Sequence, residues 1–215
     1  MRFQSALALL PLVSLFSAPV LAQETIDGME IVDTEAWEDS SRFKEEVLDA
    51  HNRAREERNA THLTWDDDLE KSARKWADEC KWEHSGDDNG ENLATNYASP
   101  NSSVEAWVVE EEEYDPKDPK FSKKTGHFTQ VVWKDTEKVG CAAKDCGDAD
   151  KGIEEGGPAR GWFLVCQYTP QGNVKGQFDD NVDKVGESGV AGLGVGWGKM
   201  GLLLAGVAAV GMIGL

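Results

Sequence analysis

Basic residues are scarce in this sequence, and their scarcity excludes two classes of partner. Lysine and arginine number 22 against 40 aspartates and glutamates, which gives a formal net charge of −18 at pH 7. Nucleic acids and anionic lipid surfaces are bound through basic faces, which this composition does not supply. We therefore expect no nucleic-acid partner and no electrostatic attachment to membranes. The acidity is typical of a protein kept in solution in an acidic or wall-like medium.

Long hydrophobic runs are missing from the interior and occur only at the two ends. The first end, residues 1–22, has an apolar stretch from Ala6 to Phe16 and small residues up to Ala22. This pattern predicts a secretory signal peptide that is cleaved after Ala22. A retained membrane anchor is the alternative, but Pro11 and Pro19 interrupt a run that is already short for a span. We therefore expect an extracellular protein.

The other hydrophobic end, residues 200–215, carries no charge. A linker and Gly-rich spacer, residues 179–199, precede it and contain the small residues Ser188 and Gly189. A small attachment site, a spacer and an apolar tail are typical of a glycolipid (GPI) anchor signal. We expect attachment at Ser188 or Gly189, which would place the protein at the cell surface or wall. A membrane-spanning tail helix and a low-complexity tail without an anchoring role remain open.

Motifs for common metal and nucleophile chemistry are also missing. The sequence has no H-E-x-x-H zinc-protease motif and no C-x-x-C pair, which argues against cysteine-ligated zinc. Ser85 follows His84 directly, but it is the fold that brings a nucleophile and its base together. We expect a binding protein rather than an enzyme, with a metal-dependent hydrolase as the less favoured alternative.

Between the two ends, residues 41–178 have the length of one domain that can bury a core, and residues 23–40 are expected to be a flexible acidic leader. An even number of cysteines in an exported chain is typical of disulfides, here two, and the sequence alone leaves three pairings open. The cysteines are Cys80, Cys141, Cys146 and Cys166. Asn59 and Asn101 begin N-glycosylation sequons, so both are expected at the surface.

Hydrophobic spacing predicts three helices and at least three strands. The first helix is expected to begin at Ser40 or Ser41, and the second at Asp66–Asp68. The third is expected to cover Ser102–Glu113. The strands are expected over Phe128–Trp133, Val139–Ala142 and Trp162–Tyr168, the last two joined by a loop over Gly147–Gly161. Mixed helices and short strands in this order indicate a layered α+β domain.

Four motifs occur in order inside this domain. They are Asp49-Ala50-His51-Asn52-x-Ala54-Arg55; His84-Ser85 with Gly90-Glu91-Asn92-Leu93-Ala94; Gly126-His127-Phe128-Thr129-Gln130-Val131-Val132-Trp133 with Val139-Gly140-Cys141-Ala142; and Phe163-Leu164-Val165-Cys166-Gln167-Tyr168-Thr169-Pro170-Gln171-Gly172-Asn173. Together they resemble the CAP superfamily of cysteine-rich secretory, antigen 5 and pathogenesis-related proteins, and most of all its fungal secreted members that bind sterols.

The resemblance implies a three-layer α-β-α sandwich and a specific disulfide pairing, Cys141–Cys166 with Cys80–Cys146. It also implies a cleft lined by two histidines and two glutamates. By motif these are His84, Glu91, Glu110 and His127, and they could hold Zn²⁺ or another divalent ion. A polar network that only fixes the cleft is the alternative. His51 is expected to form structural hydrogen bonds, and His62 to lie on the surface.

The resemblance further implies a small hydrophobic ligand, a sterol or a fatty acid, bound for export or sequestration. A loop between the third helix and Gly126, residues 114–125, carries Tyr114 and Phe121, whose rings could lie against a sterol. The alternative for each ring is that it packs onto the domain. The alternative for the whole protein is an effector or wall-interaction protein whose partner is a protein or a glycan.

Overall fold

The computed structural model describes residues 25–26 and 29–183. The expected signal peptide, the Ser188 and Gly189 attachment site and the hydrophobic tail lie outside these residues. The chain divides into two compact units, Met1–Ile31 and Val32–Leu215. In the first unit, β1 (Thr25–Ile26) pairs antiparallel with β2 (Met29–Glu30). Every other element belongs to the second unit.

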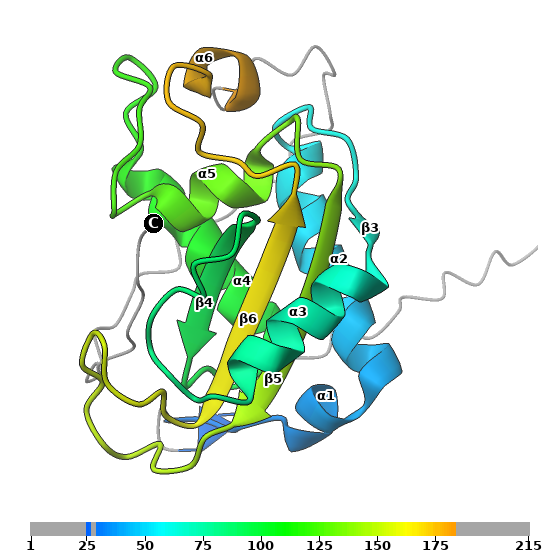
Figure 1. Ribbon diagram of the computed structural model, residues 1–215, viewed down its shortest axis with the longest axis vertical. Helices are drawn as coiled ribbons and strands as arrows, with labels where there is room; N and C mark the ends of the chain where they lie inside the picture. The colour runs from blue at the N-terminus through cyan, green and yellow to red at the C-terminus, as the bar shows by residue number, and fades with distance from the viewer. Residues whose placement is uncertain (1–24, 27–28, 184–215) are drawn as a thin grey trace, which may run out of the picture. The chain divides into compact units, whose positions relative to one another are not determined.

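A four-stranded sheet forms the middle layer of the second unit, in the order β3-β5-β6-β4. The strands are β3 (Thr64–Trp65), β4 (Gly90–Thr95), β5 (Lys138–Asp145) and β6 (Trp162–Thr169). Strand β3 runs parallel to β5, whereas β4 and β5 each pair antiparallel with β6. The central position of β6 is visible in Figure 1.

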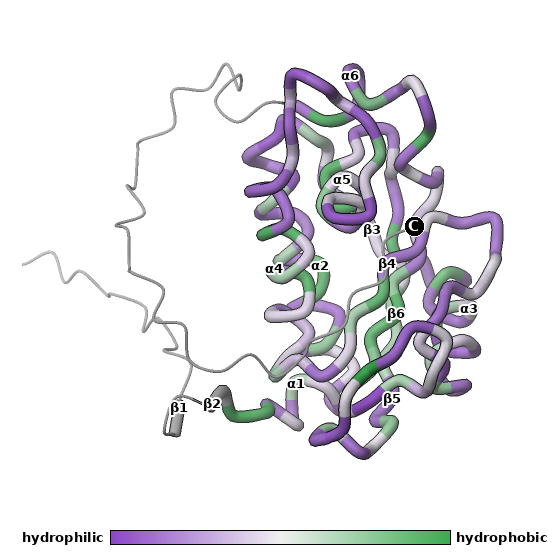
Figure 2. Tube along the Cα trace, turned by 90° about the vertical axis from the view of Figure 1, so that its left-hand side faces the viewer, coloured by the Kyte–Doolittle hydropathy of each residue, from purple (hydrophilic) through white to green (hydrophobic). Residues whose placement is uncertain are grey.

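Helices cover both faces of this sheet. They are α1 (Thr34–Glu38), α2 (Ser40–Glu56), α3 (Asp67–Ala77), α4 (Pro100–Val109), the 3₁₀ turn η1 (Glu110–Glu113), α5 (Gly126–Val132) and α6 (Phe178–Asn181). Seen along the sheet, α3 lies on one side and α2 and α4 lie on the other (Figure 2). The three-layer α-β-α sandwich is therefore confirmed.

Two hydrophobic clusters fill the spaces between the layers. Because successive side chains of a strand point to opposite faces, β6 supplies both clusters. Phe163 and Val165 pack with Ala73 and Ala77 of α3, whereas Leu164 belongs to the larger cluster under α2, α4 and α5. No residue of β6 is exposed, as expected for a strand covered on both sides.

Glycine at position 140 allows α3 to lie close against the sheet. A Cβ atom built at Gly140 would lie 2.3 Å from the backbone nitrogen of Glu70 and 2.5 Å from the carbonyl oxygen of Asp66. Both contacts are to backbone, so a larger residue would have to push the first turn of α3 away from β5. This contact explains the glycine of the Val139-Gly140-Cys141 motif.

The disulfides are Cys141–Cys166 and Cys80–Cys146, the pairing that the resemblance implied. Cys141 and Cys166 are opposite one another on β5 and β6, and both are fully buried. Cys80 and Cys146 join the turn after α3 to the residue after β5, nearer the surface. Each bridge therefore ties a separate pair of elements.

The leader is not wholly flexible, which corrects the expectation for residues 23–40. Asp33 caps α1 through the backbone N–H of Ala36, and Trp37 is 5% exposed. The Trp37 ring stacks on Trp162 with a centroid distance of 5.3 Å, and its Nε1 donates to the carbonyl of Ala98. The helix that follows is capped by Asp39 rather than by Ser40 or Ser41.

The predicted set of strands also needs two corrections. The strand expected over Phe128–Trp133 is wrong, because Gly126–Val132 form helix α5. Conversely, Gly90–Thr95 form strand β4, which was not predicted. Within the described residues, no helix is both long and apolar enough to cross a membrane.

Candidate functional site

Glu110 and His127 form the first of two His–Glu pairs. Glu110 follows the last residue of α4, and His127 is the second residue of α5. The Nδ1 atom of His127 lies 2.6 Å from Oε1 of Glu110. The other oxygen, Oε2, accepts the backbone N–H groups of His127 and Phe128 at 3.0 and 3.1 Å. Glu110 thus caps the N-terminus of α5 and orients its histidine at the same time.

His84 and Glu91 form the second pair. Glu91 is the second residue of β4 and is 3% exposed. Its Oε1 atom lies 2.8 Å from Nδ1 of His84 and accepts the Ser85 backbone N–H, while Oε2 accepts from Nε2 of Gln167. Burial raises the pKa of Glu91, but the hydrogen bonds from His84, Ser85 and Gln167 outweigh burial and hold that pKa below its usual value.

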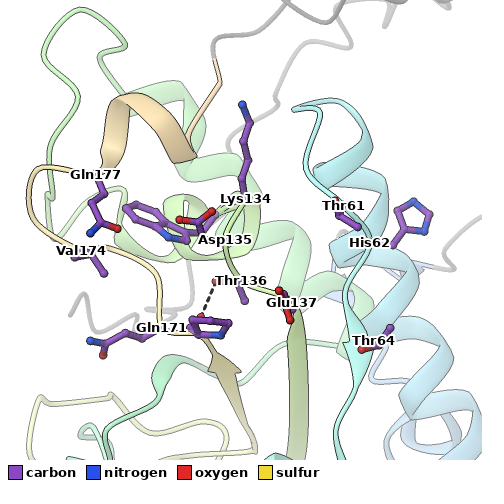
Figure 3. Close-up of a pocket in the computed structure, with 12 residues that line it drawn as sticks. Thr61, His62, Thr64, Lys134, Asp135, Thr136, Glu137, Gln171, Val174 and Gln177 are labelled. Atoms are coloured by element: carbon purple, nitrogen blue, oxygen red, sulfur yellow. Dashed lines mark hydrogen bonds between the residues drawn. The ribbon is translucent and has the colours of Figure 1, made fainter.

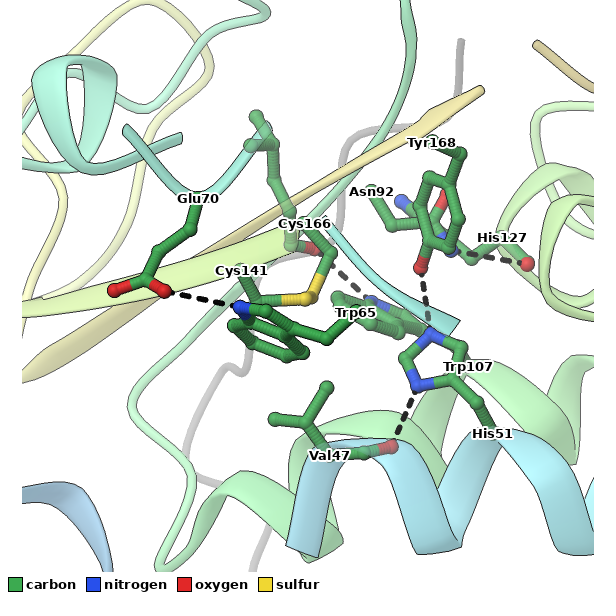
Figure 4. The surroundings of a disulfide bond; sticks show 11 residues. Val47, His51, Trp65, Glu70, Asn92, Trp107, His127, Cys141, Cys166 and Tyr168 are labelled. Atoms are coloured by element: carbon green, nitrogen blue, oxygen red, sulfur yellow. Dashed lines mark hydrogen bonds between the residues drawn. A yellow bond between two sulfur atoms is a disulfide. The ribbon is translucent and has the colours of Figure 1, made fainter. Parts of the chain in front are cut away.

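The two pairs are connected through β4 and α4. Asn92, the residue after Glu91, donates from Nδ2 to the carbonyl of His127 at 3.1 Å. The ring of Trp107 stacks on His127 with a centroid distance of 6.1 Å and donates from Nε1 to the carbonyl of Leu93. Figure 4 shows Asn92, Trp107 and His127 close to the Cys141–Cys166 disulfide. The pairs are thus held by the disulfide-tied core.

Both histidines keep one ring nitrogen unused. The Nε2 atoms of His84 and His127 are buried and have no hydrogen-bond partner in the described part of the chain. Each Nδ1 faces a carboxylate, which favours the neutral tautomer with the proton on Nδ1 and the lone pair on Nε2. Neutral imidazole nitrogens of this kind are good ligands for Zn²⁺, so each histidine offers one nitrogen that a metal ion could use.

The two glutamates of the predicted metal-ligand set each contact the histidine beside them. The oxygens of Glu91 and Glu110 already accept hydrogen bonds from ring, backbone or, for Oε2 of Glu91, side-chain amide N–H groups. Among the described residues, no group of three or more His, Cys, Asp or Glu side chains is arranged to hold a metal ion. The carboxylates therefore act here as the partners that orient the histidines.

The loop of residues 114–125 places its two aromatic rings differently. Tyr114 packs edge-to-face on Phe128 at 5.8 Å, and its hydroxyl is buried without a hydrogen-bond partner among the described residues. Burial, with Asp179 and Asp115 nearby, raises the pKa of Tyr114 to about 12. Phe121 is 36% exposed.

The Phe121 ring lies directly over the start of α5. A Cβ atom built at Gly126 would be 2.9 Å from Cε2 of Phe121. Gly126 precedes His127, so the exposed ring sits beside the Glu110–His127 pair. On the other side of this pair in the sequence, Val109 directly precedes Glu110 and is 60% exposed. Phe121 therefore lies at the start of the helix that carries His127, and Val109 is the sequence neighbour of Glu110.

The other two histidines occupy the predicted places. His51 is fully buried, with Nδ1 2.7 Å from the carbonyl of Val47 and Nε2 2.8 Å from the hydroxyl of Tyr168 (Figure 4). Its structural role is confirmed. His62 is exposed and pairs with Glu56 at 2.6 Å.

Arg55 is a structural centre that the sequence did not reveal. It is fully buried on α2 and donates to the carbonyls of Thr61, Val131, Trp133 and Thr136 at 2.7–2.9 Å. Burial lowers the pKa of Arg55 to about 10. In the sequence it ends the first of the four motifs, but a surface position is the ordinary expectation for an arginine, so its buried role was not predicted.

The sequon asparagines lie at the surface to different degrees. Asn59 is exposed and donates to Asp183 at 3.1 Å. Asn101 is half-buried in the first turn of α4, where its side-chain oxygen accepts from Arg53 at 2.7 Å. Attachment of a glycan to either stays a prediction.

The profile of the cysteine-rich secretory protein (CAP) family matches residues 48–168, more than half of the chain. The chain belongs to the CAP family. It is 41% identical over 145 residues to Protein PRY2 of Saccharomyces cerevisiae, covering 65% of this chain and 41% of the relative. It is 39% identical over 142 residues to Secreted protein RBT4 of Candida albicans, covering 63% and 37%.

A plant relative matches this CAP chain over more of its own length. The pathogenesis-related protein PR-1 type of Sambucus nigra is 35% identical over 143 residues, covering 62% of this chain and 79% of the relative. By contrast, the chain spans only about two fifths of the two fungal relatives. One fungal relative is named as a secreted protein, which supports the extracellular location predicted here.

Solved structures of the CAP type share the fold. The crystal structure of Na-ASP-1 matches with a TM-score of 0.50 and 24% identity, over 61% of this chain and 39% of that one. At this identity the match concerns the fold alone.

Proposed function

We propose that this secreted CAP protein binds sterols, fatty acids or similar small hydrophobic molecules, for their export or sequestration. The observation that carries the proposal is the Phe121 ring, 36% exposed on the loop above the Glu110–His127 pair. An exposed aromatic ring keeps apolar surface in contact with water, and a ligand that covers it removes that surface from water, which is favourable. A flat, rigid ring system of a sterol would cover it well.

The exposed apolar side chains near the loop support a hydrophobic ligand. In the described part of the chain, the large hydrophobic residues that are exposed are Ile31, Val32, Val109 and Phe121. Of these four, Phe121 lies over Gly126, which precedes His127, and Val109 precedes Glu110 in the sequence. A ligand that covers the Phe121 ring would contact apolar carbon close to the helix that carries His127.

A polar end of the ligand also has partners in this region. The hydroxyl of Tyr114 and the Nε and Nη1 atoms of Arg58 are buried and lack partners among the described residues. Both side chains contact the same ring, since Arg58 lies 5.3 Å above Phe128 and Tyr114 packs against its edge. A sterol hydroxyl or a fatty-acid carboxylate could accept hydrogen bonds that the protein leaves unmade.

The test is the binding of radiolabelled sterol and radiolabelled long-chain fatty acid to the purified secreted protein. We expect saturable binding of at least one of them. Phe121→Ala should weaken it by about tenfold or more, since the ring contributes its apolar area to the contact. Lys123→Ala, an exposed substitution in the same loop, is the control and should bind like the wild type. No binding of either lipid by the wild type would overturn the proposal.

We also propose that a divalent metal such as Zn²⁺ binds at the two histidine pairs. The observation in favour is the pair of buried Nε2 atoms on His84 and His127, both without a partner among the described residues. A bound ion would supply positive charge near the loop of residues 114–125, the proposed lipid loop. Glu91 and Glu110 would hold the two imidazoles in orientation.

Attachment to the cell surface by a GPI anchor is proposed from the sequence of the tail. Ser188 and Gly189 are the candidate attachment residues, followed by an apolar end. Treatment of intact cells with a phospholipase that cuts GPI anchors should release the protein into the medium. Protein that stays on the treated cells, or that is already in the medium, would contradict the anchor.

A further inference from the structure

A cavity of ≈ 790 Å³ lies at the end of the sheet where β6 stops and β3 and β5 start. Three chain segments line it, within residues 61–64, 133–137 and 170–177. In Figure 3, Thr61, His62 and Thr64 lie to one side of Asp135–Glu137, and Gln171, Val174 and Gln177 lie to the other. Neither the lipid loop nor the His–Glu pairs contribute to this lining.

The backbone around the cavity is held by hydrogen bonds between its segments. The hydroxyl of Thr136 donates to the carbonyl of Pro170 at 2.9 Å, and the N–H of Glu137 donates to the carbonyl of Thr169 at 3.1 Å. On the other side, the N–H of Thr64 donates to the carbonyl of Glu137 at 3.0 Å. The walls are therefore fixed before any ligand arrives.

Six polar side chains on these walls make no hydrogen bond or ion pair with another described residue, and two of them are the hydroxyls of Thr61 and Thr64. Asp135, Glu137, Gln171 and Gln177 line the cavity and are exposed, and none of their side chains makes a hydrogen bond or ion pair with another described residue. The basic lining residue Lys134, in contrast, is neutralised by Asp183. His62 likewise pairs with Glu56. The free polar groups are thus two carboxylates, two carboxamides and two hydroxyls.

The lining carries apolar carbon as well as polar groups, which suits an amphipathic ligand better than a lipid. Its apolar members include Trp133, Pro170 and Val174. Trp133 is 1% exposed, because its ring packs edge-to-face on Phe178 at 5.0 Å, so it offers almost no apolar area to a ligand. A hydrophobic molecule in this cavity would instead face carboxylates and amides and remove them from water at a cost.

The polar groups instead match a ligand that both donates and accepts hydrogen bonds. The carboxylates of Asp135 and Glu137 only accept, whereas the amides of Gln171 and Gln177 donate as well. An anion would be repelled by the two carboxylates. An ammonium or guanidinium group only donates, so it would leave the amide N–H groups unmatched. Sugar hydroxyls donate and accept at once, and neighbouring hydroxyls suit the paired atoms of carboxylates and amides.

We propose that this cavity is a carbohydrate-binding site, separate from the lipid site, for a short neutral oligosaccharide. Its volume lies within the range of small-molecule pockets. Parts of the last two sequence motifs border it: Trp133 ends one motif, and Pro170 and Gln171 belong to the next. The His–Glu pairs do not use these residues. The proposed site binds a sugar of a glycan or wall polymer while the loop binds lipid.

The test uses the purified protein and a fixed panel of neutral trisaccharides built from β-1,3-glucose, β-1,4-N-acetylglucosamine, β-1,4-glucose and α-mannose. Binding is followed by calorimetry and by ligand-observed NMR. We expect at least one panel member to bind. The double variant Glu137→Ala, Gln171→Ala should weaken its binding by about tenfold or more, since it removes one carboxylate and one amide. Phe121→Ala should bind the sugar like the wild type.

Circular dichroism and the unfolding temperature check that the double variant is folded, which its exposed positions favour. If it is unfolded, the single variants Glu137→Gln and Gln171→Ala replace it, with the same expected direction. The proposal is overturned if no trisaccharide binds, or if the variants bind as tightly as the wild type. It is also overturned if a lysine-rich hexapeptide binds this cavity and the sugars do not.

Discussion

Nδ1 of His127 lies 2.6 Å from Oε1 of Glu110, while the other oxygen of the same carboxylate caps the helix that carries His127. One glutamate therefore fixes both the position of the helix and the tautomer of its histidine. His84 and Glu91 repeat the ring contact on β4. In each pair the imidazole is left with an unused Nε2 atom directed away from its carboxylate.

This arrangement predicts pH-dependent metal binding. Calorimetric titration with Zn²⁺ should show uptake at pH 7.5 and much weaker uptake at pH 5.5, because a protonated imidazole cannot coordinate a metal ion. The double variant His84→Ala, His127→Ala should lose this uptake and still fold, since both disulfides and both hydrophobic clusters remain. Equal uptake by variant and wild type, or uptake by neither, would leave only a structural network at these pairs.

Arg55 should be among the residues least tolerant of a conservative change. Lysine cannot reach the four carbonyls that its guanidinium bridges, so Arg55→Lys should leave buried acceptors unpaired. We expect a loss of roughly 2–4 kcal/mol in the free energy of unfolding, measured in urea. The matched control is Arg53→Lys on the exposed face of α2, with an expected change within about 0.5 kcal/mol. Similar losses in the two variants would refute the buried role of Arg55.

The two disulfides should be reduced in a fixed order. Cys80 and Cys146 are only partly buried, whereas Cys141 and Cys166 are fully buried in the core. Mild reductant on the folded protein, followed by alkylation and peptide mapping, should therefore modify Cys80 and Cys146 first. Modification of Cys141 and Cys166 should require unfolding, because the attacking thiolate needs access to the sulfur. Simultaneous modification of all four in native conditions would argue against this difference in burial.

His51 should make the stability of the protein depend on pH. Burial lowers its pKa to about 4, against about 6.5 for an unfolded chain. The unfolded state therefore binds the extra proton first. The contribution of neutral His51 to the free energy of unfolding is therefore complete above pH 6.5. It is lost as the pH falls from 6.5 to 4, by about 3 kcal/mol in total.

The check on this prediction is His51→Gln, which removes the titrating group. The variant should be less stable than the wild type at pH 7, and the gap in free energy of unfolding should narrow as the pH approaches 4. Urea titrations at several pH values measure the gap directly. A gap that stays constant between pH 7 and pH 4 would mean that His51 does not control the acid sensitivity.

The sequence predicted α3 well because this helix is buried on one side only. Leu69, Ala73 and Ala77 recur at helical spacing, and Asp66 caps the first turn. Helix α5 has no such pattern, because all seven of its residues are buried, so the periodicity that separates helix from strand is missing. Its Thr129, Val131 and Val132 favour a strand locally, and tertiary packing overrides that preference.

Strand β4 was not predicted because its first residues do not favour a strand locally. Glycine, glutamate and asparagine begin it, and these residues are uncommon in strands. Here Glu91 and Asn92 are satisfied by His84, Gln167 and His127, which come from distant parts of the chain. The sequence around β4 does not include Gln167 or His127, so it could not predict the strand.

The candidate sites, like the secondary structure, were predictable from the sequence only in part. The positions of the two His–Glu pairs followed from motif resemblance, but the use of the glutamates as orienting partners depends on individual hydrogen bonds. The sugar-site cavity combines residues near 61, 135 and 171, which only the sheet brings together. Spacing along the chain could not have predicted it.

The central claim, that lipid binds at the loop of residues 114–125, can be tested most directly by photo-crosslinking. The purified protein is irradiated with a photoactivatable sterol and, separately, a photoactivatable fatty acid, and the labelled peptides are mapped by mass spectrometry. The account predicts label on residues 114–125 or around Val109, competed by unlabelled lipid and strongly reduced in Phe121→Ala but not in Lys123→Ala. Competable label confined to other parts of the chain, or no competable label with either probe, would contradict it.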